Sequence, residues 1–405
     1  MAEPKIRFKR DDGSSYPEWC DMPLNALVTE NLDPVPTPKG GYRRVGIYCH
    51  AKGTFQEDVP ADKILDVDTM YRIHKDNLIV NITFAWEHAV AIVKPEDEGL
   101  LVSHRFPEYS FNDGQVPGFY KYLILRPYFK NKLSLASPGG AGRNRVLNKA
   151  QFKEIIITVP CEEEQQKIAD FLSSVDEVIA ASEQEVANLE TQKKAVMKKI
   201  FSQEVRFKRE DGSEFPEWRK ETLGELAEFS KGQGYTKSDL SEEGEPIILY
   251  GRLYTKYQTV ITEVDTFANM KEKSVLSKKG DVIVPASGET AEDISVAAVV
   301  DVDGIILGGD INIIHPCSVV SSDYLAYSLT FGAPHQEMAK RAQGKSIVHL
   351  HNDDLKSAII VYPCLEEQHL IADFLSDFDE AIVAAKKELE RWKELKKGLL
   401  QQMFA

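Results

Sequence analysis

Several short clusters in the sequence contain residue types that could carry out chemistry. Gly344, Lys345 and Ser346 resemble the end of a phosphate-binding loop, which would hold the phosphates of ATP. Such a loop requires a glycine five residues before the second one, and Ala339 stands there. The sequence therefore does not predict an ATP site of the usual form.

The other clusters are also incomplete. Residues 33–36 are Asp-Pro-Val-Pro, which only superficially matches the Asn/Asp-Pro-Pro-aromatic motif of amino-methyltransferases, and no glycine-rich cofactor loop precedes them. His349 and His351 would share one face of a strand, but no nearby Cys, His or Glu cluster completes a metal site, so a structural or polar-contact role is expected. Cys161 and Cys364 occupy equivalent positions after a proline, where a buried thiol at a helix start is favoured over chemistry.

Composition limits the class of protein without choosing a function. The 405 residues are 42% hydrophobic and 28% charged, enough for two or three ordinary cores. The five cysteines form no CxxC pair, the start lacks a secretory pattern, and no apolar run approaches the roughly 20 residues that cross a bilayer. We therefore expect a cytoplasmic protein that does not enter a membrane.

The net charge of −15 is unevenly distributed. Residues 1–160 carry +1, 161–204 carry −5, 205–363 carry −8 and 364–405 carry −3. No segment is a basic tail, so the affinity of this chain alone for phosphate backbones should be weak. If the chain binds DNA, local cationic clusters or a basic partner must contribute.

Two blocks of sequence each occur twice. Residues 6–19 return at 205–218, and residues 164–177 return at 367–380, each pair being identical at 10 of 14 positions. The intervening stretches have similar lengths but only scattered correspondence. A period of about 200 residues is too long for a solenoid repeat, so each copy must contain at least one domain. The pattern indicates an internal two-fold repeat whose halves perform different tasks.

The second repeated block starts the clearest helices. Pro160 and Pro363 precede acidic residues that favour a helix N-terminus, and apolar residues then recur every three or four positions over about five heptads. We expect two helices of roughly 38 residues, about 57 Å long, that form a coiled coil. The predicted seam residues are Ile168, Leu172, Val175, Ile179, Val186, Leu189, Ile371, Leu375, Phe378, Ile382, Leu389 and Trp392.

Connectivity predicts the direction of the helix pair. The second globular segment lies between the helices in the chain, so an antiparallel pair is expected if that segment starts and ends at nearby points. Lys193 and Lys396 both occupy seam positions. Their stems could extend to solvent near the helix ends, or the two lysines could fix the register of the pair.

The intervening segments are typical of α+β domains. Strand-like runs at 77–86, 89–94, 281–287, 295–302 and 304–309 alternate with glycine and proline turns, and shorter helices are expected at 117–129 and 322–343. Neither segment shows a regular βαβ alternation. The expected organisation is domain 1 at 1–160, a long helix at 161–204, domain 2 at 205–363 and a second long helix at 364–405.

This arrangement resembles the specificity subunit of a type I restriction-modification enzyme. The resemblance covers essentially the whole chain and is carried by residues 160–176 and 363–379, together with the RF-x-x-x-x-G-x-x-x-P-x-W segments at Arg7 and Arg206. It implies two target recognition domains, each recognising one half of a bipartite target in double-stranded DNA. It also implies helices that set the gap between the halves and dock methylation subunits.

The resemblance also implies a division of labour between subunits. Two methylation subunits would bind S-adenosylmethionine, and up to two restriction subunits would use ATP and Mg²⁺. This chain would hold no cofactor and would supply recognition without catalysis.

Each domain has a polar, glycine-containing turn before its last strand, at residues 139–145 in domain 1 and 343–346 in domain 2. These turns match the family and supply the leading candidates for DNA contact. An arginine there can pair with guanine or phosphate, and an asparagine can pair with adenine. Further candidates are cationic, aromatic and hydroxyl residues elsewhere in the two domains, whereas Trp19 and Trp218 are interpreted as structural anchors. The complete candidate set is Arg43, Arg44, Arg72, Lys75, Arg143, Asn144, Arg145, Lys231, Tyr235, Lys237, Arg252, Tyr254, Lys256, Tyr257, Ser287, Thr290, Lys345 and Ser346.

Two other functions remain open at this point. The chain could be a self-contained methyltransferase or nuclease whose motifs are not recognisable, which would predict methyl transfer without a partner. It could also be a protein-interaction scaffold, which would predict partner binding without sequence-selective DNA affinity.

Overall fold

The computed structural model describes residues 4–63, 67–139, 145–256, 258–342 and 347–404. The chain forms two compact units. Unit 1 contains Met1–Glu183 and Lys387–Ala405, and unit 2 contains Gln184–Lys386. Both boundaries between the units fall inside long helices, so each unit contains a part of both helices.

The two long helices are α5 (Glu162–Phe201) and α11 (Leu365–Met403), with 40 and 39 residues. Each follows the expected proline, and acidic side chains occupy the first turn, where the helix dipole favours negative charge. Gly398 lies within α11 and does not end it. The prediction of two uninterrupted helices of roughly 38 residues is confirmed.

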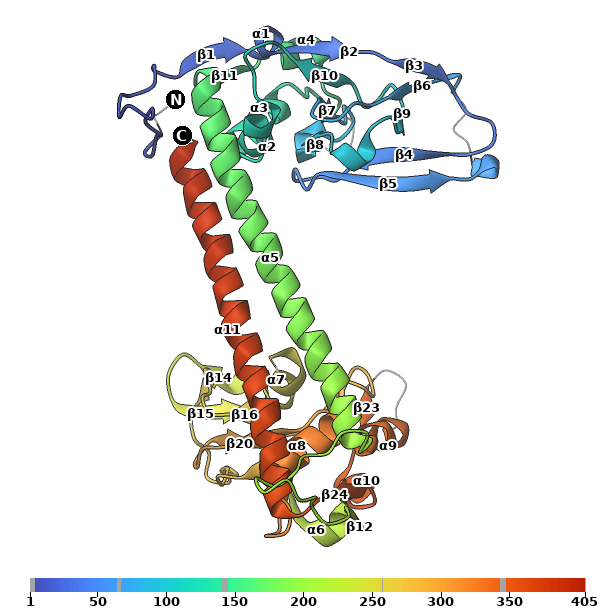
Figure 1. Cartoon of the computed structure of the whole chain (residues 1–405), viewed down its shortest axis with the longest axis vertical. Coiled ribbons are helices and arrows are strands. Elements are labelled where there is room, and N and C mark those ends of the chain that lie inside the picture. The colour runs from blue at the N-terminus through green and yellow to red at the C-terminus, as the bar shows by residue number, and fades with distance from the viewer. Residues whose placement is uncertain (1–3, 64–66, 140–144, 257, 343–346, 405) are drawn as a thin grey trace. The chain divides into compact units, whose positions relative to one another are not determined.

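Within each unit the two helices lie side by side and run antiparallel, as predicted (Figure 1). Their direction follows from ion pairs in which the residue number rises along α5 and falls along α11. These pairs are Asp176–Lys396 and Glu183–Lys393 in unit 1, and Glu190–Lys386 and Lys193–Asp379 in unit 2.

The predicted seam residues differ in burial. Some are buried, and these are Ile168, Leu172, Val175, Ile371, Leu375, Ile382 and Leu389. The others are partly exposed, and these are Ile179, Val186, Leu189, Phe378 and Trp392. The most deeply buried seam residues, among them Leu172 and Leu375, belong to the cores of the globular domains.

The described part of unit 1 combines small sheets with short helices. One sheet contains, in order, the strands β3 (Pro34–Pro36), β6 (Thr69–Arg72), β9 (Leu101–Val102), β4 (Tyr42–Ile47) and β5 (Thr54–Val59). A second sheet contains β2 (Val28–Asn31), β10 (Glu108–Phe111), β7 (Leu78–Val80) and β8 (Val90–Ile92). A third pairs β1 (Cys20–Pro23) with β11 (Ile156–Val159). The short helices are α1 (Leu24–Leu27), α2 (Pro117–Leu123), α3 (Pro127–Leu135), α4 (Lys149–Lys153) and the 3-10 turns η1 (Ala61–Lys63), η2 (Ala85–Glu87) and η3 (Pro95–Asp97).

Unit 2 has the same class of fold with different sheets. One sheet contains, in order, the strands β13 (Ala227–Lys231), β22 (Ile311–Pro316), β18 (Asp281–Pro285), β20 (Ala298–Val300) and β16 (Val260–Ile261). A second sheet contains β14 (Leu240–Ser241), β17 (Phe267–Ala268), β15 (Glu245–Ile248) and β21 (Ile306–Leu307). Two further pairs are β12 (Arg219–Thr222) with β24 (Ile359–Tyr362), and β19 (Ser287–Gly288) with β23 (Val348–His349). The short helices are α6 (Leu223–Leu226), α7 (Tyr250–Thr255), α8 (Ser322–Phe331), α9 (Ala333–Arg341), α10 (Asn352–Lys356) and the 3-10 turn η4 (Lys237–Asp239).

The α+β fold class is confirmed, but some predicted elements are divided. The helix expected at 117–129 is two helices, because Pro127 cannot continue the first and instead starts α3. The region 322–343 is likewise divided between α8 and α9, with Gly332 and Pro334 at the junction. The strand expected at 77–86 ends at Val80, and a 3-10 turn follows.

The repeated segments make the same contacts in each unit, and we call them the frame. The frame consists of residues 6–19 and 164–177 in unit 1, and of residues 205–218 and 367–380 in unit 2. In unit 1 the guanidinium of Arg7 pairs with the buried carboxylate of Glu164 at 2.7 Å, and the ring of Trp19 packs edge-on against Phe119. In unit 2 the equivalent contacts are Arg206 with Glu367 at 2.8 Å, and Trp218 with Tyr324. Both tryptophans contact the core of their domain, as expected of structural anchors.

The frame also joins each domain to both helices. The core of unit 1 contains Leu172 from α5 together with Met403 and Phe404 at the end of the chain. The core of unit 2 contains Leu375 from α11 and Ile200 from α5. Within the described residues, no helix combines the length and apolar character that crossing a membrane requires.

Candidate nucleic-acid interface

The hairpin of β4 and β5 carries the first pair of predicted DNA contacts. Arg43 and Arg44 stand opposite Asp58 and Glu57 in the strand register. Nε of Arg43 lies 2.8 Å from Oδ1 of Asp58, and Nη2 of Arg44 lies 2.8 Å from Oε2 of Glu57. The hydrogen bond from Arg43 lowers the pKa of Asp58 below its ordinary value. Both arginines are accessible, but a phosphate would have to compete with these carboxylates.

A second cationic group of unit 1 lies around β6. Nη1 of Arg72 is 3.9 Å from Oδ2 of Asp33, and Lys75 is exposed just beyond the strand. Asn31 lines a small pocket beside Arg72 and donates a hydrogen bond of 3.0 Å to the buried carboxylate of Glu108. Sequence reasoning missed Asn31, because only the fold brings it beside Arg72.

Arg145 is held by its own domain. Its Nη2 donates to the carbonyl oxygen of Ser134 at 2.6 Å, its Nε donates to that of Ser137 at 3.1 Å, and its guanidinium lies 5.5 Å from the ring of Trp86. Ser134 belongs to the last turn of α3, where the helix dipole favours a cation. Arg145 therefore stabilises the end of α3, and a DNA contact would require it to leave these partners.

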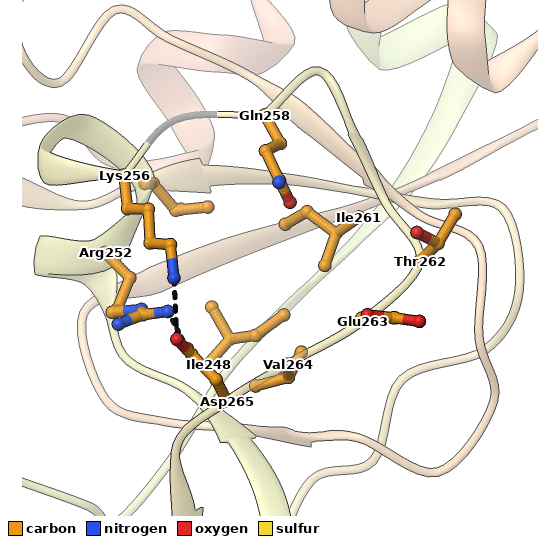
Figure 2. Close-up of a pocket in the computed structure, with 10 residues that line it drawn as sticks. Ile248, Arg252, Lys256, Gln258, Ile261, Thr262, Glu263, Val264 and Asp265 are labelled. Atoms are coloured by element: carbon orange, nitrogen blue, oxygen red, sulfur yellow. Dashed lines mark hydrogen bonds and ion pairs between the residues drawn. The ribbon is translucent and has the colours of Figure 1, made fainter. Parts of the chain in front are cut away.

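The candidate site in unit 2 with the most defined geometry is a pocket beside α7 (Figure 2). It has a volume of about 310 Å³ and is lined by Arg252 and Lys256 of the predicted set. Both cations pair with Asp265, which lies 2.6 Å from Nζ of Lys256. Hydrogen bonding with Lys256 and the nearby charge of Arg252 lower the pKa of Asp265, so this carboxylate stays charged.

This pocket has the donors and acceptors that base recognition requires. Arg252 has five N–H donors, and the ion pair with Asp265 fixes the guanidinium while leaving donors for a ligand. Gln258 and Thr262 also line the pocket, and an amide side chain can pair with an adenine edge as an arginine can with guanine. Gln258 and Asp265 were missed because neither residue type is distinctive and only folding places them beside α7.

Two of the residues predicted to contact DNA in unit 2 are buried in the structure. The ring of Tyr235 is 5% exposed, its hydroxyl accepts a hydrogen bond of 2.7 Å from the backbone N–H of Lys271, and its ring belongs to a small apolar core. Ser287 is 4% exposed and bonds to Asp310. Both residues are parts of the domain interior, which the polar or aromatic residue type alone could not reveal.

The remaining predicted contacts are distributed over unit 2. Lys231 and Lys237 are exposed, and Tyr254 is partly buried on α7. Thr290 is exposed, and its hydroxyl accepts a hydrogen bond from the backbone N–H of Asp293. Further predicted contacts lie outside the described residues, and these are Arg143, Asn144, Tyr257, Lys345 and Ser346.

A hydrogen-bonded series of Ser230, His315 and Asp281 also escaped the sequence search. Oγ of Ser230 lies 2.8 Å from Nε2 of His315, and Nδ1 of His315 lies 2.6 Å from Oδ1 of Asp281. The three residues lie on β13, β22 and β18, which are consecutive strands of one sheet. A ladder of polar side chains across neighbouring strands accounts for this geometry.

The structure gives the two histidines of the sequence search a simple relationship. The rings of His349 and His351 are stacked, with centroids 6.2 Å apart and an angle of 7° between the planes. Among the residues that the structure describes, no group of three or more His, Cys, Asp or Glu side chains is placed to hold a metal ion.

Comparison with protein families gives a match in each unit. Residues 48–191 and 216–391 match the family model described as the type I restriction modification DNA specificity domain. Among curated proteins, the chain is 26% identical over 297 residues to the type I restriction enzyme MjaVIII specificity subunit of Methanocaldococcus jannaschii, which covers 70% of this chain and 69% of that protein. It is also 26% identical over 360 residues to the putative type I restriction enzyme MjaX specificity subunit of the same organism, covering 86% and 81%.

Solved structures share the fold. The type I restriction-modification system S subunit from M. genitalium aligns with a TM-score of 0.59 at 14% identity, covering 100% of this chain and 99% of that one. A chain from a structure of a type I R-M system, whose subject is complex assembly and conformational transition, aligns with a TM-score of 0.56 at 18% identity, covering 96% and 98%.

Proposed function

The chain belongs to the family of type I restriction-modification specificity subunits, and from this premise we propose that its two domains each recognise one half of a split target in double-stranded DNA. The observation that carries the proposal is that the same frame occurs in both units around domains that differ. The Arg7–Glu164 and Arg206–Glu367 pairs are geometrically equivalent, whereas the sheets that the two frames hold differ in strand order. Two different recognition surfaces on equivalent supports are suited to an asymmetric target.

In this proposal the long helices set the gap between the two half-sites. A helix of 40 residues is about 60 Å long, which is comparable to roughly two turns of DNA at about 34 to 36 Å each. The helices also bear the two copies of the repeated block, so equivalent surfaces are offered to two copies of a single partner. We assign that role to two methylation subunits.

The chemistry is assigned to the partners. The methylation subunits would bind S-adenosylmethionine, and up to two restriction subunits would bind ATP and Mg²⁺. This chain would contribute recognition without catalysis. The Ser230–His315–Asp281 series is the arrangement in the described residues that most resembles a hydrolase site. Covalent labelling of Ser230 by a fluorophosphonate probe would contradict the non-catalytic assignment.

The proposal is tested by co-expressing the chain with the methylation subunit of its host and mapping methylated adenines in the genomic DNA. One split motif, present only when both proteins are expressed, is expected. Methylation by the purified chain alone would favour a self-contained methyltransferase. A stable complex that shows no sequence-selective DNA binding would favour an interaction scaffold.

A further inference from the structure

Each long helix carries a lysine at a position where the heptad pattern otherwise places apolar residues. Lys193 on α5 is 6% exposed, and Lys396 occupies the equivalent position on α11. A charged side chain is costly at such a position unless a partner satisfies it. The structure supplies an aspartate for each lysine, from the opposite helix.

In unit 2, three segments of the chain meet at Asp379 of α11. Nζ of Lys193 forms an ion pair with one carboxylate oxygen and lies 5.3 Å from the ring centroid of Tyr327. The hydroxyl of Tyr327, on α8 of the recognition domain, donates to the other oxygen at 2.7 Å. The hydroxyl of Thr259 donates to that same oxygen at 3.2 Å.

Unit 1 contains the equivalent arrangement at Asp176 of α5. Nζ of Lys396 lies 2.5 Å from Oδ1 of Asp176 and 5.7 Å from the ring centroid of Tyr122. The hydroxyl of Tyr122, on α2 of the recognition domain, donates to Oδ2 at 2.8 Å. Lys121 reaches the same oxygen at 3.1 Å.

The equivalence of the two clusters is not imposed by the sequence around the tyrosines. Asp176 and Asp379 belong to the repeated block, but Tyr122 and Tyr327 lie in the divergent domains. Each tyrosine nevertheless occupies an equivalent position in the chain. Tyr122 lies six residues after Val116, and Tyr327 lies six residues after Ser321. The backbone N–H groups of Val116 and Ser321 donate hydrogen bonds to the side chains of the repeated glutamines, Gln165 and Gln368, at the start of the long helices. Two domains with different sheets therefore present a tyrosine hydroxyl to the same place on the frame.

We propose that these Lys–Asp–Tyr clusters are positioning residues that fix the axial register of α5 against α11 and thereby restrict the DNA target to one gap length. This inference rests on the proposed function. An apolar seam tolerates a shift of one heptad, about 10 Å, because equivalent side chains meet again. A shift by one heptad would separate each lysine from its aspartate, and Lys193 would then face Ala372 or Lys386 instead of a carboxylate, so the clusters exclude the shifted pairing.

The tyrosines extend this control to the recognition domains. The carboxylate that pairs with the lysine also accepts the tyrosine hydroxyl, so the helix register and the placement of the domain depend on one group. Removal of either partner of the carboxylate should therefore permit additional gap lengths without changing the bases that each domain recognises. A cluster that only stabilised the fold would not have this effect.

The test uses three variants of this chain, Asp176→Asn, Lys396→Met and Tyr122→Phe. Each variant is expressed in cells together with the methylation subunit, and the methylated adenines in the genomic DNA are mapped. We expect both half-sites to be unchanged and methylation to appear at additional gap lengths, within about three base pairs of the original one. The double exchange Asp176→Lys with Lys396→Asp should restore part of the original selectivity. The matched control is Lys393→Met, which removes the same charge from an exposed pair with Glu183 on the same helices and should leave the gap unchanged.

Each alternative outcome is informative. Methylation at only the original gap in all three variants would overturn the inference and leave the proposed function intact. Loss of methylation at every gap in both Asp176→Asn and Tyr122→Phe would assign the cluster a purely structural role and would also overturn it. A wild-type complex that yields no split motif would instead contradict the proposed function.

Discussion

Arg206 and Glu367 form a doubly bonded ion pair in unit 2, with Nε–Oε1 and Nη2–Oε2 distances of 3.2 and 2.8 Å and a carboxylate that is 0% exposed. Nη2 of the same guanidinium also donates to the carbonyl oxygen of Pro216 at 2.7 Å. The pair therefore joins the entry segment of the second domain to the start of α11.

Replacement of Arg206 by alanine should destabilise unit 2 strongly. It would leave the buried carboxylate of Glu367 without its cation, which costs about 3–5 kcal/mol in the free energy of unfolding. Urea unfolding measures the change. Arg209→Ala is the matched control, because Arg209 pairs with exposed Glu366 at 3.5 Å and its loss should cost no more than about 1 kcal/mol. Equal losses in the two variants would show that the Arg206 pair has no special role.

Asp176 should make stability depend on pH in the acid range. Burial raises the pKa of this carboxyl, but hydrogen bonds from Lys396, Tyr122 and Lys121 outweigh burial and lower the pKa below its ordinary value. Because its pKa is lower in the folded state, the ionised carboxylate of Asp176 adds to the free energy of unfolding. This contribution is complete above the pKa of the unfolded state, about 3.9, and is lost as the pH falls through the pKa of the folded state.

The Asp176→Asn variant tests this sign. At pH 7 the variant should be less stable than the wild type by about 1–3 kcal/mol, and the difference should shrink below about pH 4. Urea unfolding at a series of pH values measures it. Glu183→Gln, which alters an exposed interhelical pair, should change stability little at any pH. A difference that grows on acidification would contradict the assignment.

Arg252 and Lys256 should affect DNA binding in different ways. If Arg252 pairs with a base edge, Arg252→Ala should weaken binding to the cognate site by about 1–3 kcal/mol and relax selectivity at one position. Lys256→Ala should weaken binding to all sequences and reduce the salt dependence by about one phosphate contact. Salt titrations of the complex on cognate and altered duplexes separate these outcomes. Lys279→Ala, which removes an exposed cation paired with Asp301, serves as the control.

The carboxylate partners in the β4–β5 hairpin should oppose DNA binding. Glu57→Gln would free Arg44 from its 2.8 Å ion pair and should raise affinity at low salt, whereas Arg44→Ala should lower it. The two variants remove opposite charges from one exposed pair, so they share a similar effect on folding. Changes of the same sign in both variants would exclude Arg44 as a DNA contact.

Tyr235→Phe should affect stability and leave recognition unchanged. The hydroxyl of Tyr235 accepts from the backbone N–H of Lys271, and its ring is buried, so loss of the hydroxyl should cost about 0.5–1.5 kcal/mol of unfolding free energy. Thermal unfolding and DNA binding by the same preparation measure both properties. An altered target sequence would place Tyr235 in the interface after all.

The frame was predictable from the sequence because its signals are local and occur twice. Proline followed by acidic residues marks the start of each long helix, and the heptads define its inner face. The ion pair of Arg7 with Glu164, by contrast, joins residues 157 positions apart, and no periodic pattern indicates it. Only the repetition of both segments suggested that they act together.

The candidate interface was less predictable for a physical reason. Arginine, lysine and tyrosine side chains serve solvent, neighbouring carbonyl groups or DNA equally well, and their surroundings decide among these roles. Arg145 contacts the end of α3, Tyr235 lies in a core and Arg252 lines a pocket, although all three were candidates for DNA contact in the sequence. The partners that distinguish them, such as Ser134 and Asp265, become neighbours only on folding.

Each domain is proposed to recognise one half of the target independently of the other domain, and an exchange of one domain tests this. Residues 20–155 are replaced by those of a relative with a different target, and methylated adenines are mapped in cells that also contain the methylation subunit. We predict that one half of the motif changes while the other half and the gap stay the same. A change in both halves, or in neither, would contradict the claim.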